Sequence, residues 1–207
     1  MDYWLRLLIG GDVKPVLVNT HHLASQVMEY VSNSPYAPDV ITTYENTLLG
    51  TAGTLLKNRA FFSDEPVMLI HGDNLSLFDL RAFQNAYEQR PRGVEITMMT
   101  FTTSTPESCG IVEVDEMGLA RAFHEKVKNP PGNVANAAVY IMSPQIFDFL
   151  EVLGKEVIDL STEVLPNYLG RMNTFHNDVY HRDIGAPESL MAAQQEYPIF
   201  EEAYRGR

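Results

Sequence analysis

The stretch Val67-Met68-Leu69-Ile70-His71-Gly72-Asp73-Asn74 decides the fold class of this 207-residue chain. Its four apolar residues are too few for a helix and predict a buried strand, which the following glycine and polar residues end. Asp73 is therefore expected at the carboxyl end of a strand, where open α/β sheets bind their ligands. A carboxylate there suits Mg²⁺, although Asp73 could equally cap the next helix or form a turn with Asn74.

Outward from this stretch, the first half of the chain alternates helices and strands. Periodicity predicts helices over residues 2–9, 22–31 and 77–89, and strands over residues 15–19, 39–43 and 94–101. Such alternation is typical of a parallel sheet with crossover helices. The second half differs, with a predicted hairpin over residues 110–124 and strands over 137–142 and 179–183. We therefore predict an α/β fold in a single domain over residues 1–207.

Composition restricts the classes of partner. The chain has 27 acidic residues against 15 basic ones, a formal net charge of -12, which argues against a nucleic-acid surface. No stretch approaches the roughly 20 apolar residues that span a bilayer, so no membrane partner is expected. The single cysteine, Cys109, excludes an internal disulfide and favours a reducing, cytoplasmic setting.

Three further segments carry residues suited to phosphate or sugar chemistry. Asp183 also follows a predicted strand and precedes a glycine turn, so it could share a metal with Asp73; a simple turn carboxylate is the alternative. The turn over residues 49–53 opens a helix, where glycines permit close approach and free N–H groups can meet an anion. Glu125 could accept hydrogen bonds from sugar hydroxyls and Lys126 could neutralise a phosphate, although a solvated sheet edge is the plainer interpretation.

Taken in order, these segments resemble the sugar-phosphate nucleotidyltransferase family, especially its mannose-1-phosphate guanylyltransferase-like members. The resemblance covers nearly the whole chain and rests on VLVNTH (16–21), LGTAG (49–53), GDN (72–74), CGIV (109–112), FHEK (123–126), NAAVY (136–140) and RDIG (182–185). It implies a Rossmann-like three-layer nucleotide-diphospho-sugar transferase fold with a mostly parallel central sheet, from which the family's N-terminal strand is missing.

The resemblance also implies a reaction, in which a sugar 1-phosphate attacks the α-phosphate of a nucleoside triphosphate and releases pyrophosphate. Asp73 and Asp183 would hold Mg²⁺ and, with Lys126, would be the catalytic residues. The residues implied to bind the nucleotide are Glu45, Leu49, Gly50, Thr51, Ala52, Gly53 and Asp73. Those implied to bind the sugar phosphate are Gly110, Glu125, Lys126 and Asn136. An acceptor-only carboxylate at Glu45 favours guanine, and hence GTP.

The sequence departs from the family's pattern as well. The family's N-terminal strand and its G-x-G-T-R loop, which cradle the triphosphate, would come before Met1, and neither G-x-G-x-x-G nor G-x-x-x-x-G-K-[ST] occurs in the chain. Smaller departures are Val127 for proline, Cys109 for tyrosine and Ala138 for glycine. A missing central strand would leave strand edges unpaired, so we expect low stability or self-association, including a homo-oligomer.

Three functions stay open at this point. The chain could be part of an active, longer enzyme that begins upstream of Met1. It could be a catalytically inactive homologue that binds nucleotide sugars and regulates a partner. A glycosyltransferase of the related fold is the least favoured, because Asp73-Asn74-Leu75 lacks the second aspartate of a D-x-D metal motif.

Overall fold

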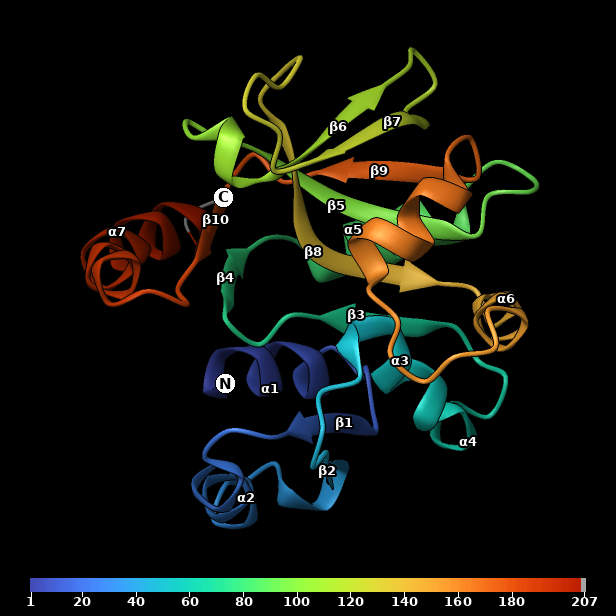
Figure 1. Ribbon diagram of the computed structural model, residues 1–207. Coiled ribbons are helices and arrows are strands. Elements are labelled where there is room, and N and C mark those ends of the chain that lie inside the picture. The colour runs from blue at the N-terminus through green and yellow to red at the C-terminus, as the bar shows by residue number, and fades with distance from the viewer. Residues whose placement is uncertain (206–207) are drawn as a thin grey trace.

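A six-stranded sheet lies between two groups of helices in the computed structural model, which describes residues 1–205 (Figure 1). The strands follow the order β7-β6-β8-β5-β9, and β3 pairs with residues 139–142 of β8 on the side opposite β5. Their bounds are β3 (Val67–Ile70), β5 (Ile96–Thr102), β6 (Gly110–Val114), β7 (Ala120–Glu125), β8 (Val134–Met142) and β9 (Met172–His176).

Helices cover both faces of this sheet. One face carries α1 (Asp2–Gly10) and α5 (Leu80–Glu88). The other carries α3 (Gly50–Lys57), α4 (Arg59–Phe62), α6 (Gln145–Val152) and the helical turns η3 (Leu160–Val164) and η4 (Leu165–Tyr168). Alternation along β8 explains the two cores, because Val139 and Ile141 pack on the α1 side whereas Tyr140 and Met142 pack on the α3 side. The predicted three-layer α/β fold is therefore confirmed.

The directions of the strands differ in part from the prediction. Strand β8 runs antiparallel to β3, β5 and β6, the β6–β7 hairpin is antiparallel, and only β5 and β9 pair in parallel within this sheet. The sheet is therefore mixed rather than mostly parallel. Strands β3, β5, β6 and β9 do share one direction, but β8 enters between β3 and β5 from the opposite end.

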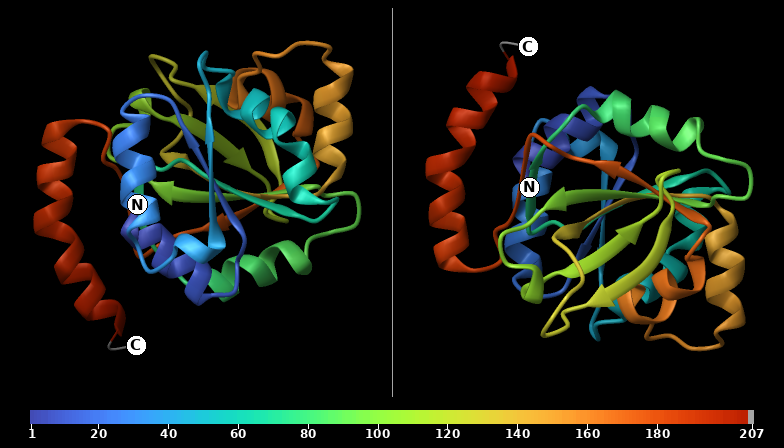
Figure 2. Two further views of the ribbon diagram at one scale, coloured as in Figure 1. Left: turned by 90° about the horizontal axis from the view of Figure 1, so that it is seen from below. Right: turned by 90° about the horizontal axis from the view of Figure 1, so that it is seen from above.

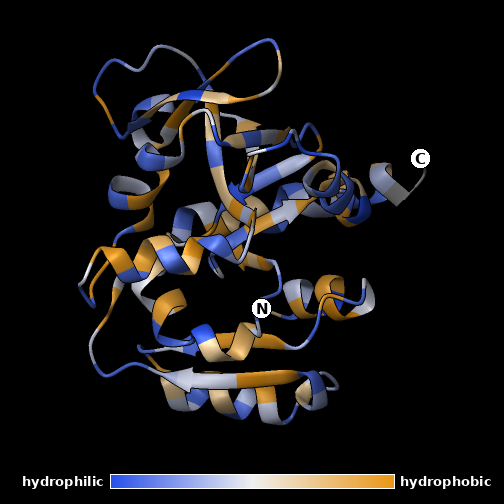
Figure 3. Cartoon of the chain, turned by 90° about the vertical axis from the view of Figure 1, so that its right-hand side faces the viewer, coloured by the Kyte–Doolittle hydropathy of each residue, from blue (hydrophilic) through white to orange (hydrophobic). Residues whose placement is uncertain are grey.

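Strands β1 (Val16–Thr20) and β2 (Val40–Tyr44) form a separate parallel pair, connected through α2 (Ala24–Ser32) and the short turn η1 (Ala37–Asp39). Figures 1 and 3 both place this unit at one end of the molecule, beyond α1 and β3. Within residues 1–205, β1 pairs only with β2 and β3 pairs only with β8. Each of them keeps an unpaired edge, as the sequence predicted.

Strand β4 (Asn74–Leu77) pairs antiparallel with β10 (Tyr180–Asp183), and the long helix α7 (Pro187–Arg205) packs against this pair along one side of the molecule (Figure 2). The remaining element is the 3₁₀ turn η2 (Pro106–Ser108). Neither β4 nor β9 was predicted, because each is short and borders a segment that reads as a helix or loop. None of the described helices is long and apolar enough to cross a membrane.

Candidate functional site

The two predicted metal carboxylates lie side by side at one end of the fold. Asp73 belongs to a turn that follows β3, closed by the Asn74 N–H, which donates to the His71 carbonyl at 3.1 Å. The β4–β10 pairing places Asp183 opposite Asn74, and the Ile184 N–H donates to the Asp73 carbonyl at 2.7 Å. The structure therefore brings Asp73 and Asp183 together, which their spacing in the sequence could not show.

Gly185 leaves open the space between these carboxylates. A Cβ at this position would lie 3.1 Å from Asp183 Oδ1 and 3.4 Å from Asp73 Oδ2. Two carboxylates facing one small space suit a hard cation such as Mg²⁺, which is typically held by one or two carboxylates together with substrate phosphates. Within residues 1–205, no group of three or more His, Cys, Asp or Glu side chains could hold a metal. A metal ion here would therefore take its other ligands from substrate and water.

Asp183 also has the structural role that the alternative prediction gave it. Its Oδ1 accepts the Gly185 N–H at 2.7 Å, and its backbone carbonyl accepts the Ser189 hydroxyl at the start of α7. This turn fixes the direction of the Asp183 carboxylate, so the turn and a metal site are compatible.

His71 joins the carboxylates to the start of α3. Its Nε2 lies 3.3 Å from Thr51 Oγ1, and its backbone N–H donates to the Ala138 carbonyl at 3.2 Å. Burial lowers the pKa of His71, and the carboxylates of Asp73, Asp159 and Asp183 partly oppose this shift. Asp159, which also caps η3 by accepting the Thr162 N–H at 2.7 Å, had no sequence motif that would have singled it out.

The glycine-rich turn over residues 49–53 packs against protein rather than standing open. A Cβ would lie 2.5 Å from the Ile158 carbonyl oxygen at Gly50 and 2.3 Å from the Glu156 carbonyl oxygen at Gly53. The Ala52 and Gly53 N–H groups donate to the Ile158 carbonyl at 3.2 and 3.3 Å. These two N–H groups are therefore not free to meet an anion, which corrects that expectation. The glycines instead allow two backbone segments to approach closely.

Glu45 is fully buried just after β2, with 0% of its surface exposed. Its N–H donates to the Thr20 carbonyl at 2.9 Å, and its carbonyl accepts from His21 Nδ1 at 2.7 Å. The Leu49 N–H reaches Oε2 at 3.4 Å, whereas Oε1 has no hydrogen-bond partner within residues 1–205. An unpaired buried carboxylate oxygen is costly, so this atom is suited to accept from a donor that the protein itself does not supply.

Glu125 and Gly110 face each other across the β6–β7 hairpin. The two residues pair in the ladder, and a Cβ on Gly110 would lie 2.7 Å from Glu125 Oε2. Burial raises the pKa of Glu125, while the adjacent Lys126 opposes this shift. Lys126 adopts a left-handed backbone with φ of 50° and has a 67% exposed side chain whose Nζ lies 4.0 Å from Glu125 Oε1. The lysine is therefore exposed, as the plainer interpretation held, but its glutamate is half-buried.

Asn136 is fixed by its neighbours on β8. Its Oδ1 accepts the Ala138 N–H at 2.9 Å and its Nδ2 donates to the Tyr140 hydroxyl at 2.6 Å. Ala138 has a φ of 50° where β8 shifts register against β5, which gives a physical reason why glycine suits this position. Burial raises the pKa of Tyr140, Asn136 opposes this, and the Glu125 carboxylate adds to it. Asn136 and Tyr140 therefore form a hydrogen-bonded pair. The sequence did not single out Tyr140, whose ring belongs to the core.

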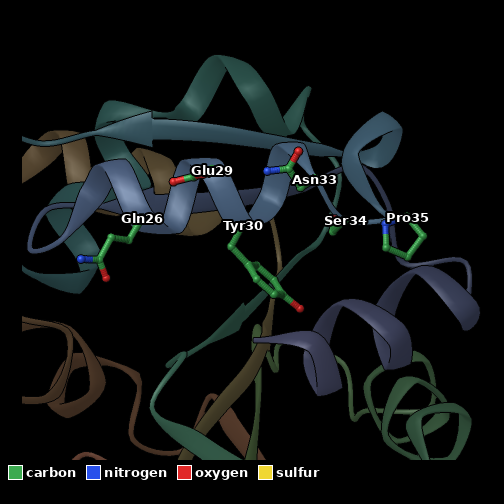
Figure 4. Close-up of a pocket in the computed structure, with 6 residues that line it drawn as sticks. All are labelled: Gln26, Glu29, Tyr30, Asn33, Ser34 and Pro35. Atoms are coloured by element: carbon green, nitrogen blue, oxygen red, sulfur yellow. The ribbon is translucent and has the colours of Figure 1, made fainter.

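A separate hollow lies on the surface of α2 and the turn after it (Figure 4). Its lining residues are Gln26, Glu29, Tyr30, Asn33, Ser34 and Pro35. They include one acidic side chain and no basic one, and the Tyr30 hydroxyl donates to Asp2 Oδ1 at 3.3 Å. This hollow therefore lacks the charges that a phosphate ligand or a metal ion would require.

Comparison with known proteins shows the family of the chain. The family model for nucleotidyl transferases matches residues 1–198, so the chain belongs to the nucleotidyl transferase family. It is similar to the mannose-1-phosphate guanylyltransferase catalytic subunit beta of Drosophila pseudoobscura pseudoobscura, with 25% identity over 90% of this chain and 51% of the relative. It is similar in the same way to the mannose-1-phosphate guanylyltransferase of Mycobacterium tuberculosis, with 25% identity over 90% of this chain and 52% of the relative.

Solved structures show the same fold. HddC from Yersinia pseudotuberculosis, complexed with GMP-PN, matches with a TM-score of 0.76 and 20% identity, over 94% of this chain and 85% of HddC. The chain spans about half the length of the curated relatives that it matches. The family and the fold predicted from the sequence are thus confirmed.

Proposed function

We propose that this chain carries the nucleotidyl-transfer site of a sugar-1-phosphate nucleotidyltransferase, which forms a nucleotide sugar and pyrophosphate. The observation that carries the proposal is the convergence of Asp73 and Asp183 on the space at Gly185. This pair of carboxylates lies in a chain of the nucleotidyl transferase family, at the end of the fold where α/β sheets bind ligands.

In the proposed reaction, an oxygen of the sugar 1-phosphate forms a bond to the α-phosphorus of the nucleoside triphosphate. The bond between the α-phosphorus and its bridging oxygen breaks, and pyrophosphate leaves with the bonding electrons. The protein's part in such a transfer is to position the reactants and to stabilise charge. Asp73 and Asp183 would hold Mg²⁺, which when bound neutralises charge on the nucleotide phosphates.

Residues of the β6–β7 hairpin and β8 would position the sugar phosphate. Lys126 is exposed enough to meet an incoming phosphate as a point charge. Glu125 offers a half-buried carboxylate to sugar hydroxyls, and Asn136 offers an amide whose orientation Ala138 and Tyr140 fix. These roles give the sugar two recognition groups of different hydrogen-bonding character.

We propose GTP as the nucleotide and a mannose-1-phosphate-like sugar as the acceptor. The unpaired Oε1 of Glu45 supports guanine, because an acceptor-only carboxylate oxygen suits an N–H donor of that base. The curated relatives named above, which are mannose-1-phosphate guanylyltransferases, support the same pairing.

A second candidate is a catalytically inactive homologue that binds nucleotide sugars. It is favoured by the glycine-rich turn, whose Ala52 and Gly53 N–H groups donate to the Ile158 carbonyl rather than standing free for a phosphate. The two candidates share the binding residues and differ in turnover.

Pyrophosphate release separates them. The chain is assayed with Mg²⁺ across a panel of nucleoside triphosphates and sugar 1-phosphates. The comparison variant is Asp73→Asn, and Asp64→Asn serves as a charge-matched control because Asp64 is an exposed turn residue in the left-handed region, which asparagine tolerates. The active-enzyme candidate is supported if the wild type and Asp64→Asn release pyrophosphate and Asp73→Asn does not. No release with any pair, together with nucleotide-sugar binding by calorimetry, favours the inactive homologue.

A further inference from the structure

Strand β10 directs its side chains to two different parts of the molecule, as the alternation of a strand requires. Tyr180 and Arg182 both bond to Glu196 of α7. On the other side, His181 Nδ1 lies 2.6 Å from the Ser76 hydroxyl, and Asp183 borders the space at Gly185. An arginine therefore directly precedes a candidate metal ligand in sequence but faces α7 instead.

Glu196 accepts two hydrogen bonds from Arg182, which together fix the direction of the guanidinium group. Arg182 Nη2 donates to Glu196 Oε1 at 2.7 Å, and Arg182 Nε donates to Oε2 at 2.9 Å. The Tyr180 hydroxyl donates to the same Oε2 at 3.1 Å. A two-point pairing of guanidinium with carboxylate is among the stronger charged hydrogen-bond arrangements, and it fixes orientation as well as distance. The two side chains are about one-third exposed, 34% and 37%.

Arg182 directly precedes Asp183 in sequence, so the charge balance of the Arg182–Glu196 pair affects cation binding at the Asp183 carboxylate. A guanidinium stays protonated at any working pH, and its planar donors match a carboxylate well. With Glu196 replaced by a neutral residue, Arg182 would be an unpaired cation next in sequence to Asp183, although on the other side of β10. Its positive charge would then oppose a divalent cation at the oxygens of Asp73 and Asp183.

We propose that Glu196 is a positioning residue that holds Arg182 on the α7 side of β10 and so keeps this cation away from the Asp73–Asp183 pair. The inference rests on the proposed function in so far as that function assigns a metal to the two carboxylates. Glu196 touches neither substrate nor metal in this account. It acts only through Arg182.

The test measures metal affinity directly, by electron paramagnetic resonance titration of the whole chain with Mn²⁺. Glu196→Gln is expected to raise the Mn²⁺ dissociation constant about fivefold, which corresponds to about 1 kcal/mol. Glu202→Gln is the matched control, because it makes the same charge change at an exposed position of the same helix. It is expected to leave the dissociation constant unchanged.

A double variant distinguishes charge competition from loosening of α7. Arg182→Met combined with Glu196→Gln removes the competing cation, and Mn²⁺ affinity is expected to return to that of the wild type. An unchanged affinity in Glu196→Gln overturns the inference, as does a double variant that binds as weakly as Glu196→Gln. A wild-type chain that binds no Mn²⁺ overturns it as well. Because Mn²⁺ binding needs no turnover, a chain that binds the metal but releases no pyrophosphate contradicts the proposed function alone.

Discussion

The carboxylates of Asp73 and Asp183 border the same missing side chain, with a Cβ on Gly185 placed 3.4 Å from one and 3.1 Å from the other. The two residues reach this point by different routes, Asp73 at the end of β3 and Asp183 through the pairing of β10 with β4. Gly185 does not adopt a left-handed backbone, so conformational freedom does not require a glycine here. The absence of a side chain itself is what keeps the space between the carboxylates open.

Filling this space is expected to weaken metal binding. Gly185→Ala places a methyl group against both carboxylates and should reduce Mn²⁺ affinity about tenfold, or about 1.4 kcal/mol, while changing the melting temperature little. Gly72→Ala is the control, because a Cβ at Gly72 would have no atom within 4 Å. Equal Mn²⁺ affinities in the two variants would show that the space at Gly185 holds no ion.

Ala138 is expected to store strain that a glycine would relieve. Its φ of 50° lies in the left-handed region, which costs an L-residue about 1–2 kcal/mol. A glycine would relieve this strain, but part of the gain is lost because glycine loses more backbone entropy on folding. Ala138→Gly should therefore raise the free energy of unfolding by about 0.5–1 kcal/mol in urea titrations. Ala137→Gly, at a fully buried neighbour without a positive φ, should lower it by about 1 kcal/mol. A loss of stability in both variants contradicts the account of strain at Ala138.

The free energy of unfolding is expected to fall in acid, because the unfolded chain protonates His181 more readily than the folded chain does. Burial lowers the pKa of His181 to about 4, and nearby Asp183 opposes the shift. The unfolded-state pKa is about 6.5, so between pH 6.5 and 4 the unfolded chain binds a proton that the folded chain does not. The folded state should therefore lose about 3 kcal/mol across this range, with no further loss from this residue below it.

Urea titrations at pH 7, 5.5 and 4.5 measure this effect. His181→Gln should flatten the dependence of unfolding free energy on pH, whatever its effect at pH 7. Parallel curves for the variant and the wild type would mean that His181 is not the group responsible.

The unpaired edges of β1 and β3 are expected to affect association. Unpaired strand edges carry backbone donors and acceptors that can pair with another chain. Sedimentation of the 207-residue chain should therefore show mass that rises with concentration, and its thermal transition should be broad or irreversible. A sharp, reversible melt of a monomer would count against this expectation.

The local features of the candidate site could be predicted, because each depends on a short stretch of sequence. The apolar run before Asp73 predicts a strand that ends in a carboxylate, and residues 110–124 predict the hairpin that carries Glu125 and Lys126. The convergence of Asp73 with Asp183 depends on β4, a four-residue strand whose pattern merges with the helix after it. No local sequence pattern predicts the pairing of β4 with β10.

The roles that sequence did not predict come from segments that meet only in the folded chain. The glycines of residues 49–53 read as ligand-contacting residues, yet Gly50 and Gly53 pack against residues 156–158, which the fold brings to them. The sequence gives Tyr140 no role, and only its hydrogen bond with Asn136 in the folded chain shows that its hydroxyl is used. Contacts between distant segments decide both roles.

Pyrophosphate release from GTP and mannose 1-phosphate in the presence of Mg²⁺ tests the central claim most directly. We expect the 207-residue chain to release pyrophosphate, and Asp73→Asn to reduce the rate about 100-fold or more without lowering the melting temperature, the scale expected when one charge-stabilising group is removed. Release that is equally fast in wild type and Asp73→Asn, or absent from the wild type with every nucleotide and sugar 1-phosphate tried, would contradict it.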